Sequence, residues 1–70
     1  MQKFIEFHVR SGGQRASVPV SNILAVQEHL DLQTEKLYCV LTIMGQSSPI
    51  KETYDQIMVK INETLNEKPI

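Results

Sequence analysis

The stretch that decides the fold is Thr53-Tyr54-Asp55-Gln56-Ile57-Met58-Val59-Lys60-Ile61-Asn62-Glu63-Thr64-Leu65. Thr53 and Gln56 have the spacing of a capping box, in which the Thr hydroxyl accepts the Gln backbone N–H and the Gln side chain reaches back. The apolar residues that follow recur every three or four positions: Tyr54, Ile57, Met58, Ile61 and Leu65. This spacing predicts a helix over about residues 54–66 with one apolar face, and that face must cover a sheet.

The residues upstream of this helix alternate between apolar and polar, as strands do. Ile5, Phe7 and Val9 begin the alternation, and it resumes after a turn at Gly12-Gly13. The pattern predicts strands at about residues 3–10, 15–20, 24–29, 37–44 and, for a short one, 49–51. The mixed, polar residues 30–36 predict a long hairpin loop, which we expect to be the most mobile segment.

These elements predict the α+β class, with a curled antiparallel sheet of four to five strands and one C-terminal helix packed on it. Residues 37–44 are apolar on both faces, which predicts the central and most buried strand. A chain of 70 residues has room for a single small domain, residues 1–70, but not for a core plus a deep, walled active site. We therefore expect no enzymatic activity.

The charge balance and the cysteine count narrow the class of protein further. Seven Lys and Arg residues against eight Asp and Glu give a net charge of −1, which does not favour nucleic acid as the partner. A lone cysteine, Cys39, cannot form an intramolecular disulfide. Glu6, His8 and Arg10 interrupt the N-terminal stretch where a signal peptide would be apolar, and no segment is apolar enough to span a membrane. We expect a soluble, cytoplasmic protein that does not associate with membranes.

The residues that could carry chemistry have simpler structural roles. His8, His29 and Cys39 are suitable metal ligands, but no two of them have the spacing of a ligand pair. The alternation places Cys39 in the core with Leu37, Leu41 and Ile43, where a thiol is inert. We therefore expect no catalytic residue, no cofactor and no bound metal.

Six residues are candidates for contact with a partner protein. Glu28, Asp31 and Glu35 cluster around the predicted loop and can form an acidic surface, although solvated loop charges are the simpler interpretation. The others are Tyr38, on the face of its strand opposite Cys39, and Arg10 and Arg15, which flank the glycine turn. One helix covers one sheet face, so we also expect a homodimer or higher oligomer, with a closed monomeric sheet as the alternative.

Two further segments carry a resemblance to a known family. They are Val18-Pro19-Val20-Ser21-Asn22-Ile23, which leads into Val26, and Ile50-Lys51-Glu52-Thr53-Tyr54, which opens the helix. Over about residues 4–65 the chain resembles the FlbD-like small flagellar and swarming-motility proteins and their uncharacterised bacterial and phage relatives. It departs from them in two places. The loop at residues 30–36 is longer, and Gly45-Gln46-Ser47-Ser48 replaces the charged or glycine-rich hairpin that usually precedes the last strand. The resemblance implies a small non-enzymatic accessory or regulatory protein and names no partner.

The sequence therefore predicts a non-enzymatic interaction or regulatory module that binds an unidentified protein through a strand edge or the 30–36 loop. The alternative is a small nucleic-acid-binding regulator, because five strands and a terminal helix also resemble the layout of carbon-storage RNA regulators. Arg10, Arg15 and Lys51 would then supply a modest basic face. A third hypothesis, a small-molecule sensor or enzyme, would use His8 or His29 as the titrating group.

Overall fold

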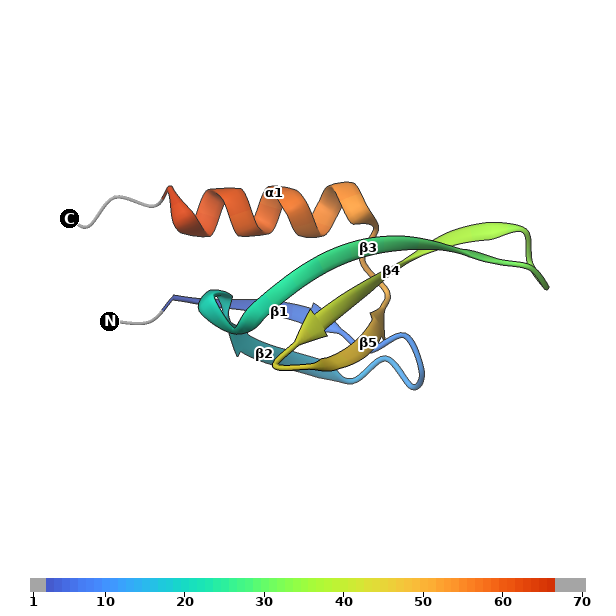
Figure 1. Ribbon diagram of the computed structural model, residues 1–70, viewed down its shortest axis with the longest axis horizontal. Coiled ribbons are helices and arrows are strands. Elements are labelled where there is room, and N and C mark those ends of the chain that lie inside the picture. The colour runs from blue at the N-terminus through green and yellow to red at the C-terminus, as the bar shows by residue number, and fades with distance from the viewer. Residues whose placement is uncertain (1–2, 67–70) are drawn as a thin grey trace.

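Five strands precede one helix in the computed structural model, which describes residues 3–66 (Figure 1). In chain order the elements are β1 (Phe4–His8), β2 (Arg15–Pro19), the 3₁₀ turn η1 (Val20–Asn22), β3 (Ile23–Asp31), β4 (Lys36–Ile43), β5 (Gln46–Ile50) and α1 (Tyr54–Leu65). The expected α+β class and the C-terminal helix are confirmed.

The helix begins as its sequence predicts. The Thr53 hydroxyl accepts the Gln56 backbone N–H at 3.1 Å, and the Gln56 side chain accepts the Thr53 backbone N–H at 3.0 Å. Asp55 lies in the first turn, where its charge complements the helix dipole. Ile57 is completely buried against the strands, so the apolar face of α1 does cover the sheets.

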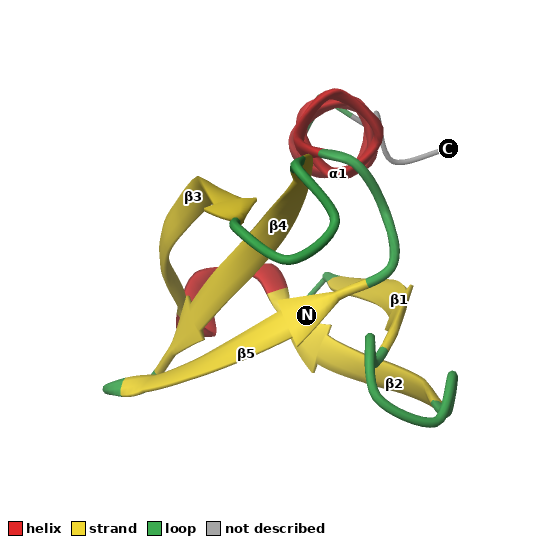
Figure 2. Ribbon diagram, turned by 90° about the vertical axis from the view of Figure 1, so that its right-hand side faces the viewer, coloured by secondary structure: helices red, strands yellow, loops and turns green. Residues whose placement is uncertain are grey.

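The strands form two antiparallel sheets, so the expectation of a single curled sheet is wrong. One sheet is the pair β1-β2, and the other has the order β3-β4-β5. The two sheets meet at an isolated bridge between Val9 and Ile50. The β1 and β5 ends are therefore joined at this bridge, and the strands diverge beyond it (Figure 2).

The hydrogen bonds around this bridge explain why the sheets separate. A continuous antiparallel ladder would place two backbone bonds on each side of the bridge. Only one forms on each side, from Arg10 N–H to the Pro49 carbonyl at 3.1 Å and from Lys51 N–H to the His8 carbonyl at 2.8 Å. Pro49 has no N–H to return, and the His8 N–H donates instead to the carboxylate of Glu52 at 2.9 Å. The ladder therefore stops after one bridge.

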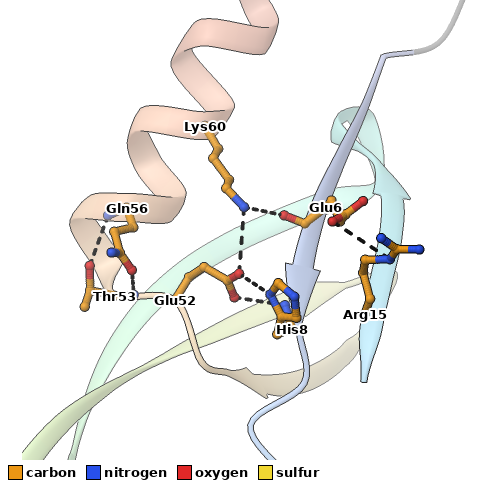
Figure 3. Close-up of polar contacts among 7 residues, drawn as sticks. All are labelled: Glu6, His8, Arg15, Glu52, Thr53, Gln56 and Lys60. Atoms are coloured by element: carbon orange, nitrogen blue, oxygen red, sulfur yellow. Dashed lines mark hydrogen bonds and ion pairs between the residues drawn. The ribbon is translucent and has the colours of Figure 1, made fainter. Parts of the chain in front are cut away.

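Side chains from the helix region satisfy the edge of β1 where another strand would pair. Glu52 bonds both the backbone N–H of His8 and its ring Nδ1, the latter at 2.8 Å (Figure 3). From the middle of α1, the Lys60 ammonium donates to the backbone carbonyl of Glu6 at 2.9 Å (Figure 3). These contacts hold α1 beside β1 and provide partners for two backbone groups on the outer edge of that strand, the His8 N–H and the Glu6 carbonyl.

The core lies between the two sheets and is closed by α1 (Figure 2). Its buried members are Ile5, Phe7, Cys39, Leu41, Ile50 and Ile57, and Val40 is buried on the other face of β4. The burial of Cys39 and the central position of β4 are as expected. Leu37, which was expected in this core, is 61% exposed because β4 begins well outside the part of the sheet that α1 covers.

The hairpin between β3 and β4 differs most from the expectation. The strands remain paired as far as Asp31 and Lys36, so the connection spans residues 32–35 rather than 30–36. The Asp31 carboxylate accepts the Gln33 backbone N–H at 2.9 Å, and the Asp31 carbonyl accepts the Glu35 N–H at 2.7 Å. Asp31 therefore forms an Asx turn, which begins the short connection directly after the last strand pair. Glu35 completes the connection in the left-handed region, with φ 58°.

The last hairpin is also tighter than expected. β5 begins at Gln46 rather than at residue 49, because a two-residue turn connects it to β4. Met44 and Gly45 form this turn with φ values of 50° and 87°. Positive φ at both positions is typical of a type I′ turn, whose twist suits two paired strands.

Candidate protein-interaction surface

The outer half of the β3-β4 hairpin projects from the rest of the molecule. We call residues 28–39 the arm. The described chain is elongated, with principal extents of 46 × 20 × 20 Å, and the arm forms one end of the long axis (Figure 1). Neither α1 nor the β1-β2 sheet extends over its tip, so the tip is open to a partner (Figure 1).

One face of the arm carries unpartnered leucines. Leu30 and Leu37 lie directly opposite each other in the strand register, and they point to the same side of the sheet as the core residues Cys39 and Leu41. They are 55% and 61% exposed, and Leu32 at the tip is 83% exposed. The apolar face of the core therefore continues onto the arm, where no element of the described chain covers it.

The opposite face of the arm is braced by Arg10, which comes from the turn after β1. The guanidinium lies over the Tyr38 ring, 4.5 Å from its centroid, and donates to the Asp31 carboxylate at 3.2 Å. The His29 ring packs beside Tyr38 with the centroids 5.8 Å apart. A cation–π contact combined with an ion pair fixes this face of the arm against the turn that follows β1.

Asp31 is held in its charged form at this brace. The Gln33 backbone N–H is the main cause that lowers the pKa of the Asp31 carboxyl, and the positive charge of Arg10 lowers it as well. The same carboxylate therefore closes the turn and pairs with the brace, which makes Asp31 a structural residue of the arm.

The structure brings together three of the six residues expected to contact a partner: Arg10, Asp31 and Tyr38. Glu28 and Asp31 are three positions apart on β3, so their side chains point to opposite faces, and the expected acidic cluster does not form one surface. Glu35 lies exposed in the turn.

Arg10 and Arg15, two residues of the basic face that the nucleic-acid alternative would use, pair with different carboxylates. Arg15 is at the start of β2 and faces Glu6 of β1, with the guanidinium 4.0 Å from the carboxylate (Figure 3). Both arginines thus have an acidic neighbour within the chain, which reduces the positive field that a phosphate backbone would meet.

A second polar cluster joins His8, Glu52 and Lys60. The Lys60 ammonium lies 3.7 Å from the Glu52 carboxylate, whose side chain is 10% exposed (Figure 3). Burial raises the pKa of Glu52, but hydrogen bonds from the backbone and ring of His8 and the charge of Lys60 outweigh it, so the net pKa is lowered. The sequence alone did not reveal this cluster, because the partners of His8 are more than forty positions away in the chain.

The buried thiol and the remaining ligand-type residues form no reactive centre within residues 3–66. Burial raises the pKa of Cys39, and the charges of Glu28 and Glu52 raise it further, which favours the protonated thiol. No group of three or more His, Cys, Asp or Glu side chains in the described chain comes together as a metal site. The described residues also include no helix of the length and apolarity needed to cross a bilayer.

The exposed leucines of the arm were not predicted from the sequence. The alternation predicts Leu37 in the core, and the polar run at residues 30–36 predicts a loop for Leu30 and Leu32. Residues 30–36 read Leu-Asp-Leu-Gln-Thr-Glu-Lys, a mixed and polar run that predicts a loop, so the strand was expected to end at residue 29. A local signal for the longer strands was present in the sequence. Asp31 and Lys36 carry opposite charges, which suits facing strand positions, and the polar residues between them suit a turn.

Comparison with known proteins adds no relative to this description. No protein-family model, no curated protein and no solved structure matches the chain. The fold and the surface alone therefore define the class, a small α+β domain that presents a braced hairpin with exposed leucines.

Proposed function

We propose that the protein is a non-enzymatic interaction or regulatory module that binds another protein through the arm. The observation that carries this proposal is the exposed pair Leu30 and Leu37, which continues the core face beyond its cover. Apolar side chains held side by side on paired strands are typical of binding surfaces. The outer edge of β3 lies beside them and can also pair with an added strand, because β3 is the end strand of its sheet.

The contacts of Arg10 support the arm as the binding element. A surface that is already ordered loses less conformational freedom on binding, and the brace orders the arm before a partner arrives. Covering the exposed halves of Leu30 and Leu37 would contribute roughly 2–3 kcal/mol. This corresponds to about 30- to 150-fold in affinity.

Membership of the FlbD-like family, with a bacterial or phage origin, is part of the same proposal. Its support is the expected helix entry at Ile50–Tyr54 and the turn that follows Val18, where the chain forms η1. A non-enzymatic role in the cytoplasm and self-association also belong to this proposal. The free, buried Cys39 is compatible with a reducing compartment.

The test compares the wild-type protein with the double variant Leu30→Ser/Leu37→Ser. Partners are captured from nuclease-treated lysate of the source cell, and the recovered protein is then purified and titrated against both forms. The expected result is a stoichiometric complex whose dissociation constant rises at least about 30-fold in the variant. Met44→Ser is the matched control, because Met44 is 73% exposed in a turn at the other end of β4.

Two outcomes would contradict the proposal. One is a complex whose affinity is unchanged in the arm variant while its thermal unfolding matches that of the wild type. The other is a partner that is released by nuclease, with affinity that falls steeply as salt is added. That second result would favour the alternative, a nucleic-acid-binding regulator, against which the pairing of Arg10 and Arg15 with carboxylates weighs.

A further inference from the structure

An apolar groove separates α1 from the first half of β3. Its volume is about 790 Å³, and its walls come from η1, β3 and α1. Leu24 forms one wall and is 66% exposed, because the strand register shifts between Ile23 and Ala25 and leaves it without a partner on β4. A β-bulge of this kind turns a side chain out of the sheet.

The other wall is a stripe along α1. It consists of Tyr54, Met58, Ile61 and Leu65, all of which line the groove. Their spacing of four, three and four residues places them in one row along the helix, as in the seam of packed helices. Tyr54 and Leu65 at the two ends are 36% and 57% exposed, whereas Met58 and Ile61 between them are half-buried.

This row is complementary to itself when a second helix runs antiparallel to it. A two-fold axis midway between Met58 and Ile61 places Tyr54 of one copy opposite Leu65 of the other, and Met58 opposite Ile61. The large aromatic ring thus meets the exposed leucine at both ends of the contact. A two-fold contact uses the same surface on both copies and closes without further growth.

The charges of α1 permit this arrangement. In the antiparallel register each charged residue of the helix, Asp55, Lys60 or Glu63, lies opposite an uncharged residue of the other copy. Antiparallel helices also bring opposite ends of their dipoles together. A net charge of −1 adds little repulsion between two copies.

We propose that the groove is the interface of a homodimer in which α1 packs against α1 of a second copy. This inference rests on the self-association included in the proposed function and specifies its geometry. Two helices of 12 residues, with Leu24 at the margin, bury on the order of 1,000 Å² in total, at the low end of specific interfaces. The dimer is therefore expected to have a micromolar dissociation constant.

The dimer presents two arms to a partner. The arm extends beyond the start of α1, away from the groove (Figure 1). A partner with two matching sites would then bind both arms, and the second contact would form at high effective concentration.

The first test is sedimentation equilibrium of the purified full-length chain over a range from about 1 µM to 1 mM. The wild type is expected to dimerise, and Leu24→Lys/Leu65→Lys is expected to raise the dissociation constant at least 100-fold. Leu32→Lys is the matched control, because Leu32 is 83% exposed at the tip of the arm and does not line the groove. A wild type that stays monomeric at 1 mM, or a dimer that the groove variant leaves intact, would overturn the proposal.

The second test concerns the direction of the helices. In the variant Tyr54→Cys/Leu65→Cys the two thiols of one chain are eleven residues apart, about 16 Å along the helix, too far to join within that chain. Mild oxidation is expected to give a covalent dimer linked between positions 54 and 65, read by peptide mapping. Links between like positions alone would exclude the antiparallel helix pair.

The arm variant Leu30→Ser/Leu37→Ser separates this inference from the partner-binding proposal. It is expected to dimerise like the wild type while losing its partner, whereas Leu24→Lys/Leu65→Lys is expected to bind the partner as a monomer. Loss of the dimer in the arm variant would place self-association on the arm and refute the groove interface.

Discussion

Replacement of Glu52 with glutamine tests whether the charge of this carboxylate stabilises the contact between β1 and the start of α1. The Glu52 carboxylate accepts hydrogen bonds from the backbone N–H of His8 at 2.9 Å and from its ring Nδ1 at 2.8 Å, and it faces the Lys60 ammonium at 3.7 Å. The side chain is 10% exposed, so solvent replaces little of this environment. Glutamine keeps the shape and one acceptor oxygen but removes the charge.

The expected loss of stability follows from these contacts. Hydrogen bonds to a charged group contribute about 1 kcal/mol more than neutral ones. The pair with Lys60, whose side chain is 42% exposed, adds about 0–1 kcal/mol. The free energy of unfolding at pH 7 should therefore fall by about 1–2 kcal/mol, which lowers Tm by roughly 5–15 °C in a domain of this size.

The pH dependence distinguishes the charge from a general packing defect. The pKa of Glu52 in the folded protein is lower than its ordinary value of 4.5, so the folded state stabilises the carboxylate. Its contribution is present above pH 4.5 and is lost as the pH falls through the lowered folded pKa. Urea unfolding of both proteins at pH 7 and pH 3 should show a gap that closes in acid.

Glu63→Gln is the matched control for this experiment, because Glu63 is exposed on the same helix. It should change the free energy of unfolding by less than about 0.5 kcal/mol. Equal stabilities of Glu52→Gln and the wild type at pH 7, or a gap of the same size at pH 3, would refute the role assigned to the Glu52 charge.

Three other substitutions or treatments test the fold. Ile57→Ala empties a fully buried position and should lower the free energy of unfolding by about 2–4 kcal/mol in urea titration, whereas Val59→Ala, at an exposed position, should change it by less than about 0.5 kcal/mol. Similar losses for the two would show that α1 does not pack as described. Met44→Asn places a residue that tolerates positive φ in the type I′ turn and should raise Tm by a few degrees in calorimetry; a lower Tm would argue against that turn. Cys39, with its raised pKa and complete burial, should react with a thiol reagent at the rate of global unfolding, and fast labelling of the folded protein would contradict its place in the core.

Local signals account for the parts of the structure that the sequence predicted well. The capping box of Thr53 and Gln56 and the spacing of the apolar helix residues act within a few positions, and the helix begins and ends within one residue of its predicted bounds. The hairpin of β1 and β2 follows in the same way from alternation around Gly12-Gly13. The buried strand β4 follows from a run that is apolar on both faces.

The candidate surface was predicted only in part. Arg10, Asp31 and Tyr38 were named from their residue types, but their contact joins three elements that the sequence does not relate. The leucines of the arm were missed, because an apolar residue in a predicted loop or strand does not reveal whether another element covers it. Leu30 and Leu41 point to the same side of one sheet, yet one is 55% exposed and the other is fully buried.

The sequence by itself determined the class, the helix with its buried face and the hairpin order. These depend on periodicity and on turn chemistry, which act between near neighbours. The tertiary structure decided that the strands form two sheets and that the β3-β4 hairpin projects uncovered. Both outcomes depend on partners far apart in the chain. Glu52 takes the His8 N–H that a continuous ladder would use, and α1 begins near the base of the arm and runs away from it (Figure 1).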